Sequence, residues 1–179
     1  MTNTDLEARI RRLEDIEAIK RLQNVYARTC DLGADPDALI ALFVPQDDEG
    51  VVWKSNIFGE HHGLEAIHKH FSGVTSTMPW AAHFMDNPVV DVSDDGLSAT
   101  GRWDLLEFST MAKADGSEGL ESVFMTAWYT NDFRKIDGQW YFYSIDVQMQ
   151  HISDWRQGWV RQPNRTGAPE DVAAGRAQR

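Results

Sequence analysis

The chain has little cysteine, little positive charge and no long apolar run. Its single cysteine, Cys30, excludes an intrachain disulfide and is typical of a reducing compartment, so we expect a cytoplasmic protein. The 28 acidic residues outnumber the 17 Lys and Arg residues, which argues against nucleic-acid binding and against binding to anionic membrane surfaces. No stretch approaches the roughly 18 apolar residues of a membrane span, and the first residues do not resemble a signal peptide.

The first 45 residues carry a helical pattern. Apolar residues recur every three or four positions from Leu6 to Val25, and this period predicts one long helix that ends near residue 30. Gly33 suits the end of that helix. The pair Asp35-Pro36 supplies an N-cap and a first-turn proline, which predict a second, short helix over about 36–43.

After the first 45 residues the sequence predicts one strand and one helix, and then only long strands. We predict a strand in "VVWKSNIFG" (51–59) and a third helix in "GLEAIHKHFSGV" (63–74). Long segments rich in β-forming residues follow, separated by Asp-Gly turn signals, and these predict antiparallel strands over about 81–93, 98–111, 121–135 and 139–151.

Helices first and strands later favour an α+β fold. We expect a strongly curved antiparallel sheet, capped by the N-terminal helices, which together form a cone-shaped α+β barrel with an apolar interior. Residues 1–155 are predicted to form this single domain. Residues 156–179 are polar and are expected to form a loosely ordered C-terminal tail.

Two stretches carry a resemblance to a known family. The segments "IEAIKRLQNVYARTCD" (16–31) and "TAWYTNDFRKIDGQWYFYSI" (126–145), with a histidine between them, resemble the SnoaL-like branch of the nuclear transport factor 2-like superfamily. The resemblance covers roughly residues 5–152. It is nearest to the lyases scytalone dehydratase, bile-acid 7α-dehydratase and hexachlorocyclohexane dehydrochlorinase.

The resemblance implies an aspartate–histidine dyad. The helix-end aspartate of these lyases matches Asp31, and their strand histidine matches His83 in "PWAAHFMDNP". A tyrosine of the bile-acid enzyme, five residues before its aspartate, matches Tyr26. An arginine of the dehydrochlorinase falls on Tyr143, so this chain departs from that pattern. The departure disfavours loss of a halide and favours an oxygen leaving group assisted by tyrosine hydroxyls.

Those residue types suit proton transfer. A neutral histidine moves protons near pH 7, and a buried carboxylate that accepts one ring N–H fixes the other nitrogen as the base. Tyr26 would stabilise negative charge on a carbonyl or leaving oxygen. We therefore expect a cofactor-independent lyase of the dehydratase type, with Asp31, His83 and Tyr26 as catalytic residues. Its substrate would be a hydrophobic cyclic molecule such as a steroid, a terpenoid or a polyketide.

Aromatic residues on or beside the predicted strands are the candidates for substrate contacts: Tyr143, Trp53, Trp128 and Phe124. The histidine pairs in residues 61–62 and 68–70 lack the spacing of a helical zinc pair, so we expect no metal site and no cofactor. The family's quaternary structures and the long first helix favour a homo-oligomer, either a dimer or a trimer.

The same candidate residues are compatible with two other functions. An isomerase or polyketide cyclase would enolise its substrate without loss of water. A ligand-binding or scaffold protein of the same fold would need no dyad, and a separation of Asp31 and His83 above about 6 Å would favour it. A hydrogen bond between them that faces an enclosed apolar pocket would favour an enzyme.

Overall fold

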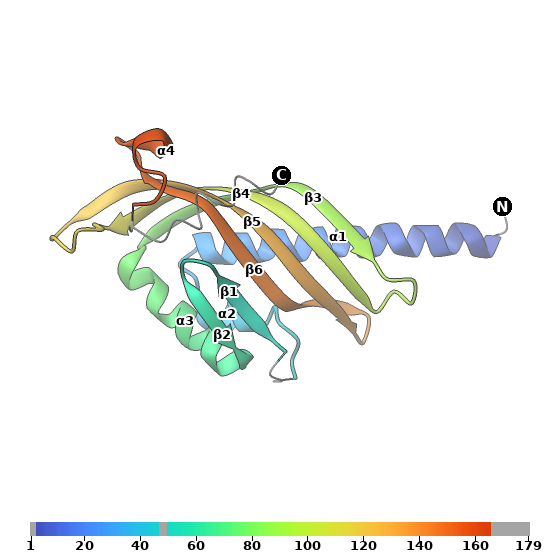
Figure 1. The fold of residues 1–179 in the computed structure, drawn as a ribbon. Coiled ribbons are helices and arrows are strands. Elements are labelled where there is room, and N and C mark those ends of the chain that lie inside the picture. Colours follow the sequence, from blue (N-terminus) through green and yellow to red (C-terminus); the bar gives the residue numbers. More distant parts are fainter. Residues whose placement is uncertain (1–2, 47–49, 166–179) are drawn as a thin grey trace.

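A computed structural model describes residues 3–46 and 50–165, and it has the predicted α+β architecture. One curved six-stranded sheet has the strand order β2-β1-β6-β5-β4-β3, and the helices α1 to α3 lie on one side of it (Figure 1). All neighbouring strands are antiparallel except β1 and β6. The helices are α1 (Asn3–Asp31), α2 (Pro36–Ile40), α3 (Gly63–Thr77) and α4 (Gly158–Arg161). The strands are β1 (Val52–Ser55), β2 (Gly59–His62), β3 (Trp80–Val92), β4 (Ser98–Ala112), β5 (Leu120–Ile136) and β6 (Gln139–Asp154).

The four long strands form the predicted meander. Each connecting turn contains a glycine with positive φ, where a side chain would be strained: Gly96, Gly116 and Gly138. Side chains alternate along β4, so Trp103 and Leu105 point into the core while Asp104 and Leu106 point away. This alternation gives the sheet an inner face that packs on the helices and an outer face.

Polar contacts fix α1 against the inner face of the sheet. Asp15 Oδ1 accepts hydrogen bonds from Trp140 Nε1 at 2.8 Å and from Lys135 Nζ at 2.6 Å. About two turns further along α1, a buried Asn131 amide donates to Gln23 Oε1 at 2.8 Å. These contacts determine where the C-terminal end of α1 lies, and that end carries the candidate catalytic residues.

The predicted long helix is confirmed, and its first turns extend past the sheet (Figure 1). Leu6, Ile10 and Leu13 are exposed there. The homo-oligomer expected from the sequence stays a prediction. Helices in the described ranges are too short or too polar to cross a membrane.

Asp35 caps α2 as predicted, because its carboxylate accepts the Asp37 N–H at 3.1 Å. The helix is shorter than expected and ends at Ile40. Strand β2 was not predicted, because its residues "GEHH" show no apolar alternation. It pairs with β1, which in turn pairs with β6, so β1 and β2 extend the meander at one edge.

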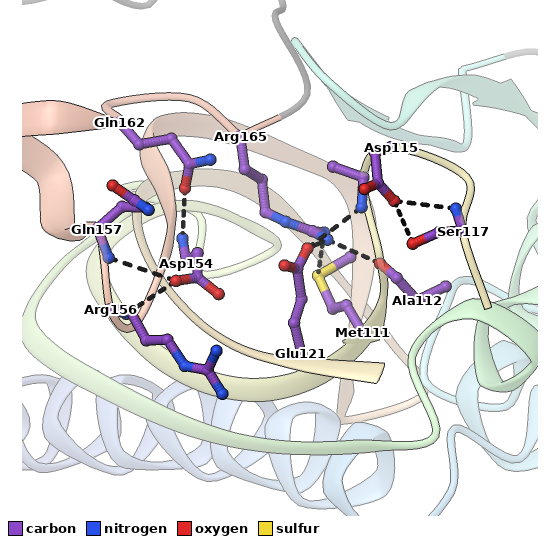
Figure 2. A network of polar contacts seen from close by, with 11 residues as sticks. Met111, Ala112, Asp115, Ser117, Glu121, Asp154, Arg156, Gln157, Gln162 and Arg165 are labelled. Atoms are coloured by element: carbon purple, nitrogen blue, oxygen red, sulfur yellow. Dashed lines mark hydrogen bonds and ion pairs between the residues drawn. The ribbon is translucent and has the colours of Figure 1, made fainter. Parts of the chain in front are cut away.

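The loosely ordered tail predicted from residue 156 is wrong for residues 156–165. This segment forms α4 and then returns to the end of β6, where the Arg165 N–H bonds to the Ile152 carbonyl at 2.8 Å. The buried Arg165 side chain donates to the Ala112 carbonyl at 2.7 Å and pairs with Glu121 (Figure 2). Burial of a charged side chain with partners from β4 and β5 requires an ordered segment. Residues 166–179 lie outside the described residues.

Candidate active site

A cavity of about 280 Å³ lies between the end of α1, α3 and the inner face of the sheet. Most of its wall is apolar and includes Phe71, Val74, Met78, Leu105 and Met149. Three ionisable side chains lie together at the end of α1 and on the facing strands β3 and β4, namely Asp31, His83 and Glu107. An apolar cavity with a few convergent polar groups is the usual form of a small-molecule site.

Asp31 is the last residue of α1, and the chain reverses directly after it. The N–H of Ala34 bonds to the Thr29 carbonyl at 3.0 Å, and Gly33 adopts φ 108°, which ends the helix. A carboxylate at a helix C-terminus is disfavoured by the helix dipole, so Asp31 needs compensating donors. His83 supplies two of them: its backbone N–H at 2.9 Å and its ring Nδ1 at 2.7 Å, both bonded to Asp31 Oδ1.

The other ring nitrogen of His83 faces a residue that the sequence reasoning missed. Glu107 lies opposite His83 in the β3–β4 register, and its Oε2 is 3.3 Å from His83 Nε2. The imidazole therefore lies between two carboxylates, one from α1 and one from β4. All three side chains line the cavity.

The surroundings change the pKa values of both partners. Burial lowers the pKa of the His83 imidazole, but the Glu107 carboxylate and the hydrogen bond to Asp31 outweigh burial, so the net pKa is raised. Burial also raises the pKa of the Glu107 carboxyl above its ordinary value, although the neighbouring His83 opposes this. Both groups thus hold protons more strongly than free side chains do.

Tyr26 lines the same cavity one turn before the end of α1. Its hydroxyl oxygen accepts a hydrogen bond from Trp53 Nε1 at 2.9 Å. The Cys30 thiol and the Tyr129 hydroxyl are its other polar neighbours. Burial raises the pKa of both tyrosines and of the Cys30 thiol, which keeps these groups protonated. Tyr26 and Asp31 both line this cavity although they lie five residues apart on α1.

A stack of rings forms another part of the wall. The His70 ring lies 4.4 Å from the Trp53 ring and 4.2 Å from the His61 ring, centroid to centroid. Burial and the neighbouring His61 lower the pKa of His70 to about 4. His70 is therefore neutral at physiological pH and adds to the apolar wall.

The predicted place of Tyr143 in the cavity is wrong. A β-bulge interrupts the pairing of β5 and β6 where Tyr143 lies, since Asp132 pairs with Ser144 and Phe133 pairs with Phe142. The extra residue shifts the alternation, so Phe142 and Ile145 are fully buried while Tyr143 is only partly buried and does not line the cavity. The Arg134 guanidinium lies over the Tyr143 ring, 4.3 Å from its centroid.

Trp128 and Phe124 are also placed wrongly by the sequence prediction. Both lie on the outer face of β5, because Tyr129 and Met125 occupy the inner positions. They line a second hollow there, with Phe84, His151 and Trp159. Of the four predicted substrate contacts, only Trp53 lines the cavity beside Asp31 and His83.

The signal for Glu107 was present in the sequence. Alternation along "RWDLLEFSTMA" places Trp103, Leu105, Glu107, Ser109 and Met111 on one face. A carboxylate in the middle of an otherwise apolar strand face is rare in a core and common in an active site. The register to His83 could not be read from the sequence.

Solved structures with the same fold align with most of this chain. A candidate scytalone dehydratase from Novosphingobium aromaticivorans DSM 12444 is 23% identical over 89% of this chain and 98% of that chain, with a TM-score of 0.68. The hexachlorocyclohexane dehydrochlorinase LinA-type3 from Novosphingobium barchaimii LL02 is 18% identical over 81% of this chain and 92% of that chain, with a TM-score of 0.68. A protein of the nuclear transport factor 2-like class with a cystatin-like fold, also from Novosphingobium aromaticivorans, is 25% identical over 83% of this chain and 90% of that chain, with a TM-score of 0.61.

The family model of the SnoaL-like domain matches residues 11–146. This range includes the end of α1 and the long strands that form the cavity wall. The predicted resemblance is confirmed, and the chain belongs to the SnoaL-like domain family, within the nuclear transport factor 2-like fold.

Proposed function

We propose that the protein is a cofactor-independent lyase that eliminates water from a hydrophobic cyclic molecule. The observation that carries the proposal is the 2.7 Å hydrogen bond between Asp31 Oδ1 and His83 Nδ1 inside a largely apolar cavity. This distance is far below the separation that would favour a scaffold protein. Relatives of the same fold include proteins named as a dehydratase and as a dehydrochlorinase, and both names describe eliminations.

The dyad suits removal of a proton from carbon. Because Asp31 accepts the Nδ1 proton, His83 Nε2 is left as the base, and the carboxylate stabilises the imidazolium that forms. The proton would come from a carbon next to a carbonyl group, and a hydroxyl on the neighbouring carbon would depart. Positioned acid–base groups of this kind accelerate a reaction by about 10²–10⁴-fold.

Tyr26 suits the stabilisation of charge on oxygen. Its oxygen accepts the Trp53 indole N–H, and a substrate oxygen would compete with Cys30 and Tyr129 for the proton of the Tyr26 hydroxyl. A hydrogen bond from Tyr26 to the substrate carbonyl would strengthen as negative charge develops on that oxygen. The raised pKa of Tyr26 keeps this proton in place.

The size and character of the cavity limit the substrate. Its volume of about 280 Å³ lies at the lower end of the range of ligand pockets, which is roughly 300–1,000 Å³. A compact terpenoid or polyketide with one or two rings fits this volume better than a steroid. The neutral His70 and the aromatic wall favour an uncharged substrate.

The test is to incubate the protein with a panel of cyclic β-hydroxy ketones in D₂O. Enone formation is followed by ultraviolet absorbance, and deuterium uptake is followed by mass spectrometry. We expect enone formation above the rate without enzyme. Deuterium uptake without enone would indicate an isomerase instead, and the absence of both on every compound would indicate a binding protein.

A further inference from the structure

We propose that Glu107 is a catalytic residue of this site, namely the general acid that protonates the departing hydroxyl while His83 removes the proton from carbon. The inference rests on the proposed lyase function and adds a second proton-transfer group to it.

Glu107 and His83 face the cavity as neighbours on adjacent strands. They are direct partners in the β3–β4 register, so both side chains leave the sheet on its inner face. The distance of 3.3 Å between Oε2 and Nε2 exceeds the roughly 2.7–2.9 Å of a strong charge-assisted hydrogen bond. The contact between them is therefore loose, and a substrate can take over both atoms.

Glu107 is buried in a way that favours its protonated form. The residue is 4% exposed, and no hydrogen bond of good geometry reaches its Oε1 in the part of the chain that the structure describes. The Ser109 hydroxyl beside it favours the charged form, but burial outweighs this effect. A charged oxygen in such a place is costly, whereas a neutral carboxyl group is tolerated. The raised pKa of Glu107 agrees with this geometry. The titratable groups around it are Asp31 and Cys30 from α1, His83 from β3 and Tyr129 from β5.

One shared proton is enough for a complete cycle. His83 Nε2 and Glu107 Oε2 compete for one proton, and the reactive form is the one in which Glu107 carries it and His83 Nε2 is free. The C–H bond breaks as its proton passes to Nε2, its electron pair forms the C=C bond, and the C–O bond breaks. The leaving oxygen takes the Glu107 proton and departs as water. The remaining imidazolium then passes its proton from Nε2 to Glu107 Oε2, which restores both groups.

Glu107 is needed only where the leaving group needs a proton. Hydroxide is a poor leaving group and must be protonated as it departs, whereas acetate departs as a stable anion. The two leaving groups on one ring therefore separate the role of Glu107 from that of His83. The probes are 3-hydroxycyclohexanone and 3-acetoxycyclohexanone, which both yield cyclohexenone.

The experiment measures cyclohexenone formation from both probes by wild type, Glu107→Gln, His83→Gln and Asp104→Asn. The Asp104→Asn control also changes a carboxylate of β4 to an amide, but on the outer face. We expect Glu107→Gln to lose on the order of 10²-fold in kcat on the hydroxy compound and less than about 10-fold on the acetate. His83→Gln should lose activity on both probes, and Asp104→Asn on neither. Deuterium uptake from D₂O by Glu107→Gln should persist, which shows that the variant is folded and that its base works.

An equal loss by Glu107→Gln on both probes would overturn the role of Glu107 as the acid and leave the lyase function standing. Wild-type rates for Glu107→Gln on both probes would overturn it as well. If wild type converts neither probe, the proposed function itself fails, and the assignment of Glu107 fails with it.

Discussion

Asp31 Oδ1 accepts two hydrogen bonds from the single residue His83, one from its backbone N–H at 2.9 Å and one from its ring Nδ1 at 2.7 Å. The first bond fixes the end of α1 against β3, and the second fixes the orientation of the imidazole. A residue that stabilises the fold and orients the base in this way makes the site rigid before substrate binds. Such preorganisation is a main source of catalytic rate.

The hydroxyl of Tyr26 is expected to contribute to rate more than to substrate binding. Tyr26→Phe should lower kcat on the order of 10²-fold with little change in KM, because the hydrogen bond strengthens only as charge develops. Steady-state kinetics on any compound that the protein converts would check this. Trp53→Phe removes the indole donor but keeps the hydroxyl, so its loss in kcat should be smaller. Equal losses for both variants would show that the effect is structural.

The lowered pKa of His70 predicts a contribution to stability that depends on pH. A histidine whose folded pKa is about 4 adds stability that is fully present above its ordinary pKa of 6.5 and is lost as pH falls from 6.5 towards 4. The free energy of unfolding of wild type, minus that of His70→Gln, should therefore shrink over this range. After allowance for the partly exposed ring, the change should be on the order of 1 kcal/mol. Urea unfolding at several pH values measures it, and a pH-independent difference would contradict the assignment.

Gly101 on β4 is expected to tolerate no side chain. A Cβ atom there would lie 2.4 Å from Trp103 Cζ3 and 3.0 Å from Phe133 Cε2, in the middle of the core. Gly101→Ala should lower the free energy of unfolding by about 1–3 kcal/mol, as overpacking generally does. The matched control is Gly73→Ala in α3, where a Cβ would meet no atom of the described residues within 4 Å. That change should stabilise the protein by about 0.5–1 kcal/mol, because alanine favours a helix. Equal effects in thermal unfolding would contradict this reading of the core.

The segment after β6 is expected to stabilise the domain through Arg165. Arg165→Met removes its hydrogen bond to the Ala112 carbonyl and its pairing with Glu121, and should cost about 1–3 kcal/mol in the free energy of unfolding. Arg161→Met changes an exposed arginine of α4 and should stay within about 0.5 kcal/mol of wild type. Chemical denaturation compares the two. A negligible effect of Arg165→Met would restore the loose tail that was expected from the sequence.

The fold was largely predictable because its signals are local. The helical period of α1, the capping residue of α2 and the Asp-Gly turns between the long strands each depend on neighbouring residues. Strand β2 was missed because its formation depends on pairing with β1 rather than on its own residues.

The site was predictable only in part because it depends on which residues pair between neighbouring strands. The resemblance drew attention to Asp31 and His83, whose residue types suit acid–base chemistry. Tyr143 was misplaced because a bulge in β6 shifts the alternation, and no local residue signals that bulge. The partner of His83 Nε2 follows from the β3–β4 pairing, which joins residues 24 positions apart, so the contact of Glu107 with His83 could be seen only in the structure.

The most direct test of the dyad is the kcat of His83→Gln and Asp31→Asn on a substrate that wild type converts, beside His68→Gln and Asp37→Asn. The two controls make the same changes in an exposed hydrogen-bonded pair away from the cavity wall. The dyad predicts a loss of about 10²–10⁴-fold for His83→Gln, a loss of similar order for Asp31→Asn, and control rates within about threefold of wild type. Rates for His83→Gln and Asp31→Asn that match those of the controls would contradict it.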